Sequence, residues 1–338
     1  HSYLNVLSSF ETYRSVDAIW NIFFSFDFYV YLLLAVLIFH ILFSRIYKTR
    51  NPMDDILSDS EFEEVLQAWN PEKIIGPDQL SEIVHRIDPV ITESKGVYLT
   101  VDGVSAVNFA SFDFLGFSGE DTIKNDSEEA IRKYGVGSCG PRGFYGTMDV
   151  HLELEEKLPH FVGAEAGMIY SYDLSTPASI IPVFLKRGDV IIYDEAVSYP
   201  ILSGISVSKA DSFFFRHNDI DHLQDVIIQA NEKYDKINRK NLNRRFIIIE
   251  GLYQNTGCIS PLVQILQIAE HFKYRIYLEE SMSIGVLGTR GKGSCEHHGV
   301  DINEITIVSG SMATSFASFG GYAVGGKALI AHKKLSGS

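Results

Sequence analysis

From residue 149 to residue 309 the chain alternates short β-forming runs with longer segments of helical periodicity, and this alternation constrains the fold most strongly. The β-forming runs are 167–170, 190–193, 212–215, 246–250, 275–278 and 305–309. Helix-like segments accompany them at 149–158, 220–233 and 262–272. Alternation of this kind predicts an α/β domain with a mostly parallel sheet flanked by helices. The loops at the carboxyl ends of its strands are the expected place for a functional site.

An uncharged apolar run, residues 28–44, lies near the N-terminus between Asp27 and Arg45. With the mostly apolar residues 22–26 before it, the run has roughly the ~20 residues that cross a bilayer. Because it is apolar on all sides, we expect a transmembrane helix at 22–46 rather than a buried core helix. No small-residue cleavage site follows it, which argues against a signal peptide. A helix that lies in the membrane interface stays open as an alternative.

The basic residues around this segment predict its orientation across the membrane. Arg45, Lys48 and Arg50 follow the apolar run, whereas only Arg14 precedes it. By the positive-inside rule, the N-terminal segment is non-cytoplasmic and the bulk of the chain is cytoplasmic. The other expected parts of the chain are the N-terminal segment at 1–21, a connecting region at 47–95 and a large α/β domain at 96–338.

Charge and cysteine content argue against two kinds of site. The formal net charge is −14 at pH 7, and nucleic acid is an unsuitable partner for such a chain because it requires basic patches. The three cysteines, Cys139, Cys258 and Cys295, are an odd number and lack the spacing of metal ligands. We therefore expect reduced thiols in a cytosolic compartment and no metal site.

Two runs carry the strongest motifs. Residues 134–147 read YGVGSCGPRGFYGT, in which five glycines and a proline favour tight turns over a regular helix. Residues 309–322 read SGSMATSFASFGGY, a run of small residues that ends in Gly-Gly-Tyr. Both runs resemble those of the α-oxoamine synthases, a family of pyridoxal-phosphate (PLP) enzymes. The resemblance implies the large domain of PLP-transferase fold type I.

The small-residue run lacks the lysine that this family uses. In the family, a lysine eight residues before the tyrosine holds PLP as a Schiff base. Counting back eight residues from Tyr322 reaches Thr314, and a hydroxyl group forms no imine. The resemblance therefore implies that this chain does not hold PLP covalently.

At further positions the chain also lacks the residue with which the family contacts PLP. In the run YLEESMSIGVLG at 277–288, Glu279 stands where the family has an aspartate that pairs with the pyridinium nitrogen. Met282 stands where the family has a histidine that hydrogen-bonds the ring oxygen, and methionine has no proton to donate. Ser198 stands where a histidine stacks on the ring. The phosphate-binding Gly-Phe pair aligns with Asp173-Leu174, which puts a carboxylate at an anion site. The implied conclusion is that the chain has no catalytic residues in a site of its own.

The resemblance extends from about Asn108 to the end of the chain and fits best the first long-chain-base subunits of serine palmitoyltransferase. In the family, the loop 134–147 lies at the dimer interface and borders the partner's active site. The residues expected at this interface are Tyr134, Gly137, Cys139, Gly140, Arg142, Phe144 and Tyr145. A separate tetrapeptide, residues 216–219, predicts only a polar cap on the helix that follows it.

The resemblance implies a non-catalytic subunit of a heterodimer. The partner would be a lysine-bearing catalytic long-chain-base subunit that carries the PLP and condenses L-serine with palmitoyl-CoA to 3-ketodihydrosphingosine. This chain would stabilise the partner, contribute a loop to its site and anchor the pair in the endoplasmic reticulum membrane through a single pass. A small C-terminal domain of the family would lie beyond the end of this sequence.

Two alternatives remain open from the residues alone. One is a scaffold or regulatory protein built on a PLP fold without catalysis, because a fold does not imply a function. The other is a standalone PLP acyltransferase with relocated chemistry, against which the lost acid–base groups argue. A change at Cys139 or Arg142 separates the first alternative from a contributor to the partner's active site. A scaffold would lose the complex, whereas a contributor would lose turnover with the complex intact.

Overall fold

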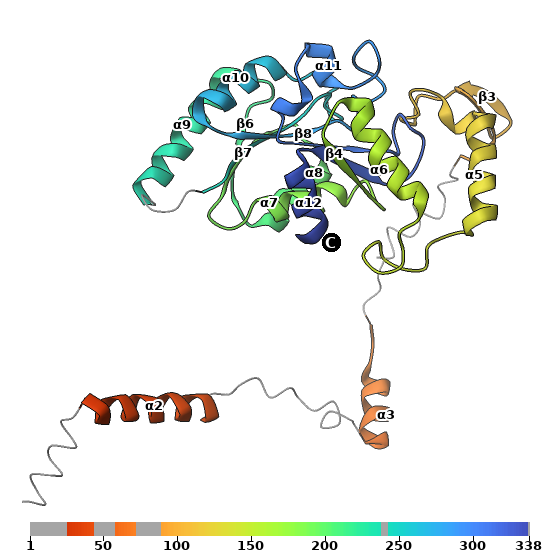
Figure 1. Ribbon diagram of the computed structural model, residues 1–338. Helices are drawn as coiled ribbons and strands as arrows, with labels where there is room; N and C mark the ends of the chain where they lie inside the picture. The colour runs from red at the N-terminus through yellow and green to blue at the C-terminus, as the bar shows by residue number, and fades with distance from the viewer. Residues whose placement is uncertain (1–25, 44–57, 72–88, 238–242, 337–338) are drawn as a thin grey trace, which may run out of the picture. The chain divides into compact units, whose positions relative to one another are not determined.

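The computed structural model describes residues 26–43, 58–71, 89–237 and 243–336. The chain divides into two units, His1–Ile87 and Asp88–Ser338. The first unit contains α2 (Phe26–Phe43) and α3 (Asp59–Ala68), drawn in red and orange in Figure 1. A capping box fixes the start of α3, because the Ser58 backbone N–H donates to the Glu61 carboxylate at 2.9 Å and the Ser58 hydroxyl accepts from the Glu61 backbone N–H.

The transmembrane helix expected at 22–46 is helical over Phe26–Phe43, while residues 22–25 and 44–46 lie outside the described residues. Among the described parts of the chain, no helix has both the length and the hydropathy to cross a bilayer. The described side chains of α2, residues 29–40, are all exposed.

The second unit is built on a seven-stranded sheet with the order β4-β10-β9-β8-β7-β5-β6. The strands are β4 (Ala166–Tyr170), β5 (Val190–Asp194), β6 (Asp211–Phe215), β7 (Arg245–Glu250), β8 (Arg275–Glu279), β9 (Ile307–Ser311) and β10 (Gly321–Gly325). Strands β6, β5, β7, β8 and β9 pair in parallel, and β10 pairs antiparallel with both β9 and β4. The predicted α/β domain with a mostly parallel sheet is confirmed.

Helices cover both faces of this sheet, as Figure 1 shows. Their bounds are α6 (Asp149–Val162), α7 (Thr176–Phe184), α8 (Tyr199–Ser208), α9 (Ile220–Ile237), α10 (Leu262–Phe272), α11 (Ser294–His298), the 3₁₀ turn η3 (Ile302–Glu304) and α12 (Lys327–Ser336). The apolar run of β7 divides between the two faces, because successive strand side chains point in opposite directions. Ile247 and Ile249 pack in the core with α9 and α10, whereas Phe246 and Ile248 pack in the core with α7 and α8. Burial on both faces explains why the central strands are apolar without alternation.

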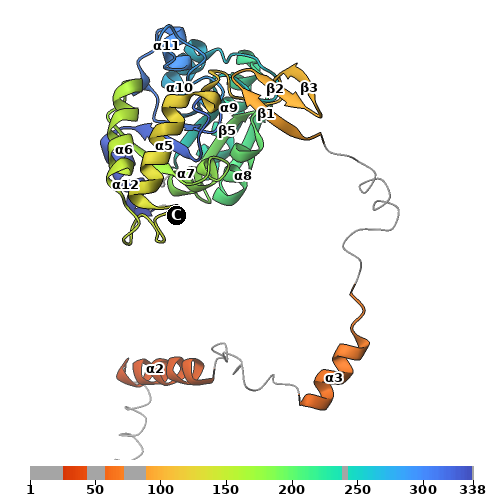
Figure 2. The same cartoon turned by 90° about the vertical axis from the view of Figure 1, so that its right-hand side faces the viewer.

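A smaller antiparallel sheet precedes these elements. It has the order β1-β2-β3, with β1 (Ile91–Lys95), β2 (Tyr98–Val101) and β3 (Val104–Val107). The short 3₁₀ turn η2 (Phe117–Gly119) and α5 (Asp121–Tyr134) follow it and lead into the glycine-rich loop. In Figure 2 the three strands lie together at one side of the second unit.

Candidate functional site

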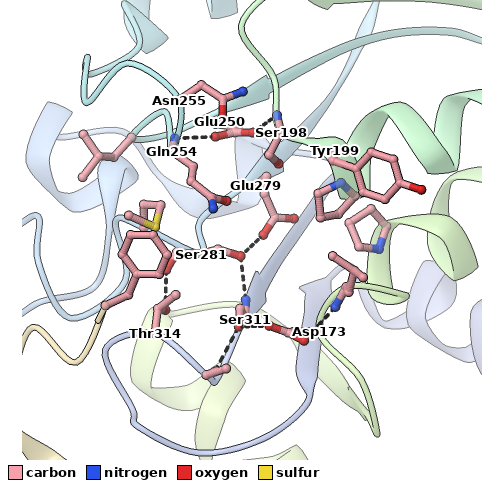
Figure 3. A pocket seen from close by; sticks show the side chains of 17 residues that line it. Asp173, Ser198, Tyr199, Glu250, Gln254, Asn255, Glu279, Ser281, Ser311 and Thr314 are labelled. Atoms are coloured by element: carbon pink, nitrogen blue, oxygen red, sulfur yellow. Dashed lines mark hydrogen bonds between the residues drawn. The ribbon is translucent and has the colours of Figure 1, made fainter. Parts of the chain in front are cut away.

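A cavity of about 310 Å³ opens at the carboxyl ends of the central parallel strands. Glu250 ends β7, Glu279 ends β8 and Ser311 ends β9, and all three line the cavity. Ser198, at the N-terminus of α8, closes another side, as Figure 3 shows. This is the edge at which parallel α/β sheets hold ligands, because the loops that leave the strands diverge there.

The cavity brings together every position at which the sequence departs from the PLP pattern. Its lining includes Asp173, Leu174, Ser198, Glu279, Met282 and Thr314. The sequence did not indicate Glu250 or Ser311 as site residues, although each ends a predicted strand or follows one, and this position was the available signal. Phe112, which precedes α5, also lines the cavity and carried no signal in the sequence.

Glu279 is buried, with 6% of its surface exposed, and both carboxylate oxygens are hydrogen-bonded. The Ser281 hydroxyl donates to Oε1 and the Ser309 hydroxyl donates to Oε2. Burial raises the pKa of Glu279 to about 7, and the negative charges of Glu250 and Glu280 act in the same direction, against the serine hydrogen bonds. Near neutral pH the group is therefore divided between the carboxylate and the carboxylic acid.

Two further carboxylates face the same space. Glu250 accepts the backbone N–H groups of Ser198 at 2.5 Å and Gln254 at 2.9 Å, and burial raises its pKa. Asp173 accepts the Ser311 hydroxyl at 2.8 Å. No lysine, arginine or histidine is among the described residues that line the cavity. The cavity is thus acidic and has no cation of its own in that lining.

Thr314 is already engaged within the cavity wall. Its hydroxyl donates to the Ser281 carbonyl oxygen at 2.6 Å, and 7% of the residue is exposed. The same serine accepts the Ser311 backbone N–H at 2.7 Å through its hydroxyl oxygen. These bonds tie the loop after β9 to the loop after β8, so Thr314 serves as a connection between two loops (Figure 3).

Stability should depend on pH through Glu279. A carboxyl group whose pKa is raised on folding, here from 4.5 to about 7, contributes its full stability below pH 4.5 and loses it as the pH rises through 7. We expect Glu279→Gln to reduce this fall by about 3 kcal/mol at most, because the amide keeps no charge to desolvate and the serine hydroxyls can reverse their donor role. Urea unfolding at pH 5 and pH 8 measures it. The exposed Glu153→Gln is the matched control, and an unchanged pH dependence in Glu279→Gln would disprove the role of this carboxyl group.

The glycine-rich loop 134–147 lies elsewhere, since none of its residues is among the described residues lining the cavity. Arg142 anchors the loop through an ion pair of 3.3 Å with Glu155 of α6, a residue that also binds Lys334 at 2.8 Å. The tip of the loop is displayed outward, with Phe144 68% and Tyr145 93% exposed and their rings packed edge to face.

The other predicted interface residues of this loop differ in exposure, and Tyr134 is partly buried. Tyr134 donates its hydroxyl to the Asp149 carboxylate at the start of α6. Cys139 is exposed and has a φ of 53°, in the left-handed region that costs a side chain energy. Gly137 is exposed, and Gly140 is partly buried. The structure therefore gathers the predicted interface residues on an outward loop and leaves their role as a prediction.

The chain is similar in sequence to a known protein family and to several characterised proteins. The family model for class I and II aminotransferases matches residues 104–336. Serine palmitoyltransferase 1 of Dictyostelium discoideum is 41% identical over 309 residues, which cover 91% of this chain and 64% of that protein. Long chain base biosynthesis protein 1 of Arabidopsis thaliana is 41% identical over 311 residues, which cover 92% of this chain and 63% of that protein. The chain thus spans less than two thirds of the length of these relatives.

Solved structures agree at the level of the fold. A serine palmitoyltransferase from S. paucimobilis matches with a TM-score of 0.69 and 21% identity, over 82% of this chain and 66% of that chain. A serine palmitoyltransferase from Sphingomonas wittichii matches with a TM-score of 0.68 and 21% identity, over 82% of this chain and 65% of that chain. These structures support PLP-transferase fold type I for the second unit.

Proposed function

This chain belongs to the class I and II aminotransferase family, and from that membership and its 41% identity to serine palmitoyltransferase 1 we propose that it is a non-catalytic subunit of a serine palmitoyltransferase heterodimer. The observation that carries the proposal is the acidic cavity without a lysine in its described lining. A protein of this fold whose cofactor site has lost the residues for the cofactor needs a partner to supply the chemistry.

The residues of the cavity do not fit PLP. A Schiff base requires a lysine amine, and the hydroxyl at Thr314 is bonded to a backbone carbonyl. A phosphate group requires hydrogen-bond donors, whereas Asp173 places a carboxylate there, and this carboxylate already accepts the hydrogen bond of the Ser311 hydroxyl at 2.8 Å. The carboxylate at the position that would pair with the ring nitrogen, Glu279, already accepts the hydroxyl groups of Ser281 and Ser309. We therefore assign the cofactor to the partner and no catalytic step to this cavity.

The partner in this proposal is a lysine-bearing long-chain-base subunit. It holds PLP and condenses L-serine with palmitoyl-CoA to 3-ketodihydrosphingosine, the entry to sphingolipid synthesis. This chain stabilises the partner and presents the loop 134–147 to its active site. The outward display of Phe144 and Tyr145, and the anchoring of Arg142 on α6, support a loop that is shaped to contact another protein.

We extend the proposal to a single-pass attachment to the endoplasmic reticulum membrane with the bulk of the chain cytoplasmic. The exposed apolar side chains of α2 support attachment to a lipid phase, because twelve consecutive exposed side chains from Tyr29 to His40 include one histidine and no other titratable cation. Extraction of membranes with alkaline carbonate tests it. Retention in the pellet is expected for a span over 22–46, and release into the supernatant would reject the span in favour of peripheral attachment.

Reconstitution tests the proposed function. We expect release of CoA from palmitoyl-CoA, dependent on L-serine, only when this chain is co-purified with a lysine-bearing homologue. Turnover by this chain alone would overturn the proposal in favour of a standalone acyltransferase. Equal turnover of the homologue with and without this chain would overturn it in favour of a scaffold without a catalytic contribution.

A further inference from the structure

A single carboxylate joins the glycine-rich loop to two other parts of the second unit. Glu155 lies in the middle of α6, and its side chain is 8% exposed. Oε1 accepts the backbone N–H of Ile169 in β4 at 3.2 Å, and Oε2 accepts the amine of Lys334 in α12 at 2.8 Å. Arg142 of the loop contacts both oxygens, with Nη1 3.3 Å from Oε1 and Nη2 3.3 Å from Oε2. The loop, β4 and α12 therefore meet on one side chain of α6.

The groups around Glu155 keep its side chain ionised. Burial acts to raise the pKa of Glu155, but the hydrogen bonds from Lys334, Ile169 and Arg142 outweigh it and lower that pKa. An arginine that contacts both oxygens of a carboxylate is fixed in direction as well as in distance, because the planar guanidinium matches the carboxylate plane. The ion pair thus sets the orientation of Arg142 relative to α6.

The tip of the loop is closed by hydrogen bonds of its own. The Pro141 carbonyl oxygen accepts the backbone N–H groups of Phe144 at 2.9 Å and Gly146 at 3.0 Å. The Thr147 hydroxyl donates to the Arg142 carbonyl oxygen at 2.7 Å and accepts the Nε–H of the same arginine at 3.2 Å. These bonds make the tip one piece, so the direction of Arg142 sets the direction of the two exposed aromatic rings.

The pair of Arg142 and Glu155 is the polar link between this tip and the rest of the second unit. Among the residues that the structure describes, no other hydrogen bond or ion pair joins residues 137–147 to another part of the chain. The rings of Phe144 and Tyr145 are exposed, so their burial does not hold the tip in place. Loss of the charge on Glu155 would therefore remove the contact that directs the tip.

We propose that Glu155 is a positioning residue, which holds Arg142 so that the tip of the loop faces the partner's active site. This inference rests on the proposed function, which gives the loop an active site to face. Glu155 acts through Arg142 and itself contacts neither substrate nor cofactor. Lys334 shares the carboxylate, but its loss leaves Glu155 bound to Arg142 and Ile169, so a change at Lys334 is the matched control.

Limited digestion of the purified chain with trypsin tests the anchor without a measurement of activity. Trypsin takes the arginine side chain into its own specificity pocket, so Arg142 is cleaved only when it leaves Glu155. Arg187 is the internal reference, because it is exposed and is also followed by a glycine. Relative to Arg187, we expect cleavage at Arg142 to be about tenfold faster in Glu155→Gln and unchanged in Lys334→Met. An unchanged ratio in Glu155→Gln, or an equal rise in Lys334→Met, would overturn the proposal and leave the proposed function intact.

Turnover of the co-purified complex tests the role of the anchor. We expect Glu155→Gln and Arg142→Gln each to lower kcat for CoA release about tenfold per mole of complex, and the double variant to lower it no further, because both remove one link. Arg142→Gln keeps the test decisive if Glu155→Gln fails to fold, since Arg142 is partly exposed on the loop. Losses that multiply in the double variant would overturn the shared link. Faster cleavage at Arg142 with unchanged turnover would overturn the positioning role together with the loop's proposed contribution to the partner's site.

Discussion

Replacing Gly146 with alanine should lower the turnover of the assembled heterodimer by about tenfold or more, while this chain still folds and binds its partner. A β-carbon at Gly146 would lie 1.9 Å from the Gly140 carbonyl oxygen and 2.6 Å from the Pro141 carbonyl oxygen. Both neighbours are backbone, so the loop must open to admit a methyl group. The exposed residues Phe144 and Tyr145 would move with the loop, away from the partner's active site that we propose they contact.

Gly143→Ala is the matched control, because a β-carbon there meets nothing within 4 Å. CoA release per mole of complex gives turnover, and size-exclusion chromatography gives the amount of complex. We expect Gly143→Ala to match the parent in both measurements. Equal turnover per complex in the two variants would contradict an active-site role for the loop. Loss of the complex, with turnover per remaining complex unchanged, would favour the scaffold hypothesis.

Replacing Gly320 with alanine should destabilise the second unit by about 3 kcal/mol or more. Gly320 has a φ of +86°, and a β-carbon would lie 2.2 Å from the Tyr170 carbonyl oxygen. Its own carbonyl oxygen accepts the Met312 backbone N–H at 2.8 Å at the turn into β10. Alanine would therefore combine left-handed strain with a backbone clash where β10 joins β4 and β9.

Gly257→Ala isolates the strain from the clash. Gly257 also has a positive φ, +71°, but a β-carbon there meets nothing within 4 Å. We expect a loss of about 1 kcal/mol for this variant, as for a side chain forced into the left-handed region. Urea unfolding followed by circular dichroism compares the two. Equal losses would show that the contact between Gly320 and Tyr170 adds nothing, contrary to the geometry.

Gly320 directly precedes β10, the strand of the seven-stranded sheet that the sequence did not predict. Six strands of the seven-stranded sheet follow from β-branched and aromatic runs, which are local signals. Strand β10 was missed, because Gly-Gly-Tyr-Ala-Val-Gly has the composition of a turn and its pairing with β4 is made across more than 150 residues of chain. Gly320 passes close to the backbone of β4, and Gly321 lies close to the Thr176 side chain at the start of α7, so neither position has room for a β-carbon. The run therefore keeps a structural purpose without the lysine of its family.

The candidate site, like the sheet, could be predicted only in part from the sequence. Ser198, Glu279, Met282 and Thr314 were identified by resemblance, and the fold places them around one cavity. The burial that raises the pKa of Glu279, and the serine hydrogen bonds that oppose this rise, depend on packing between strands and have no signal in the sequence. The hydrogen bonds of His217 were also not predicted, because residues 216–219 indicated only a helix cap. The cap is present, since the Asp219 carboxylate accepts the His222 backbone N–H at 2.9 Å. The ring of the neighbouring His217 lies between Asp194, 2.9 Å from Nδ1, and the Thr256 hydroxyl, 3.1 Å from Nε2.

The central claim is that this chain does not hold PLP, and reductive trapping tests it most directly. The purified chain is mixed with one equivalent of PLP, reduced with borohydride and mapped by peptide mass spectrometry, with a lysine-bearing homologue as the positive control. We predict one fully labelled lysine in the homologue and only sparse, scattered labelling in this chain. Complete labelling of a single lysine here would contradict the claim. Lys333 is the first residue to inspect, since burial lowers the pKa of its amine to about 8.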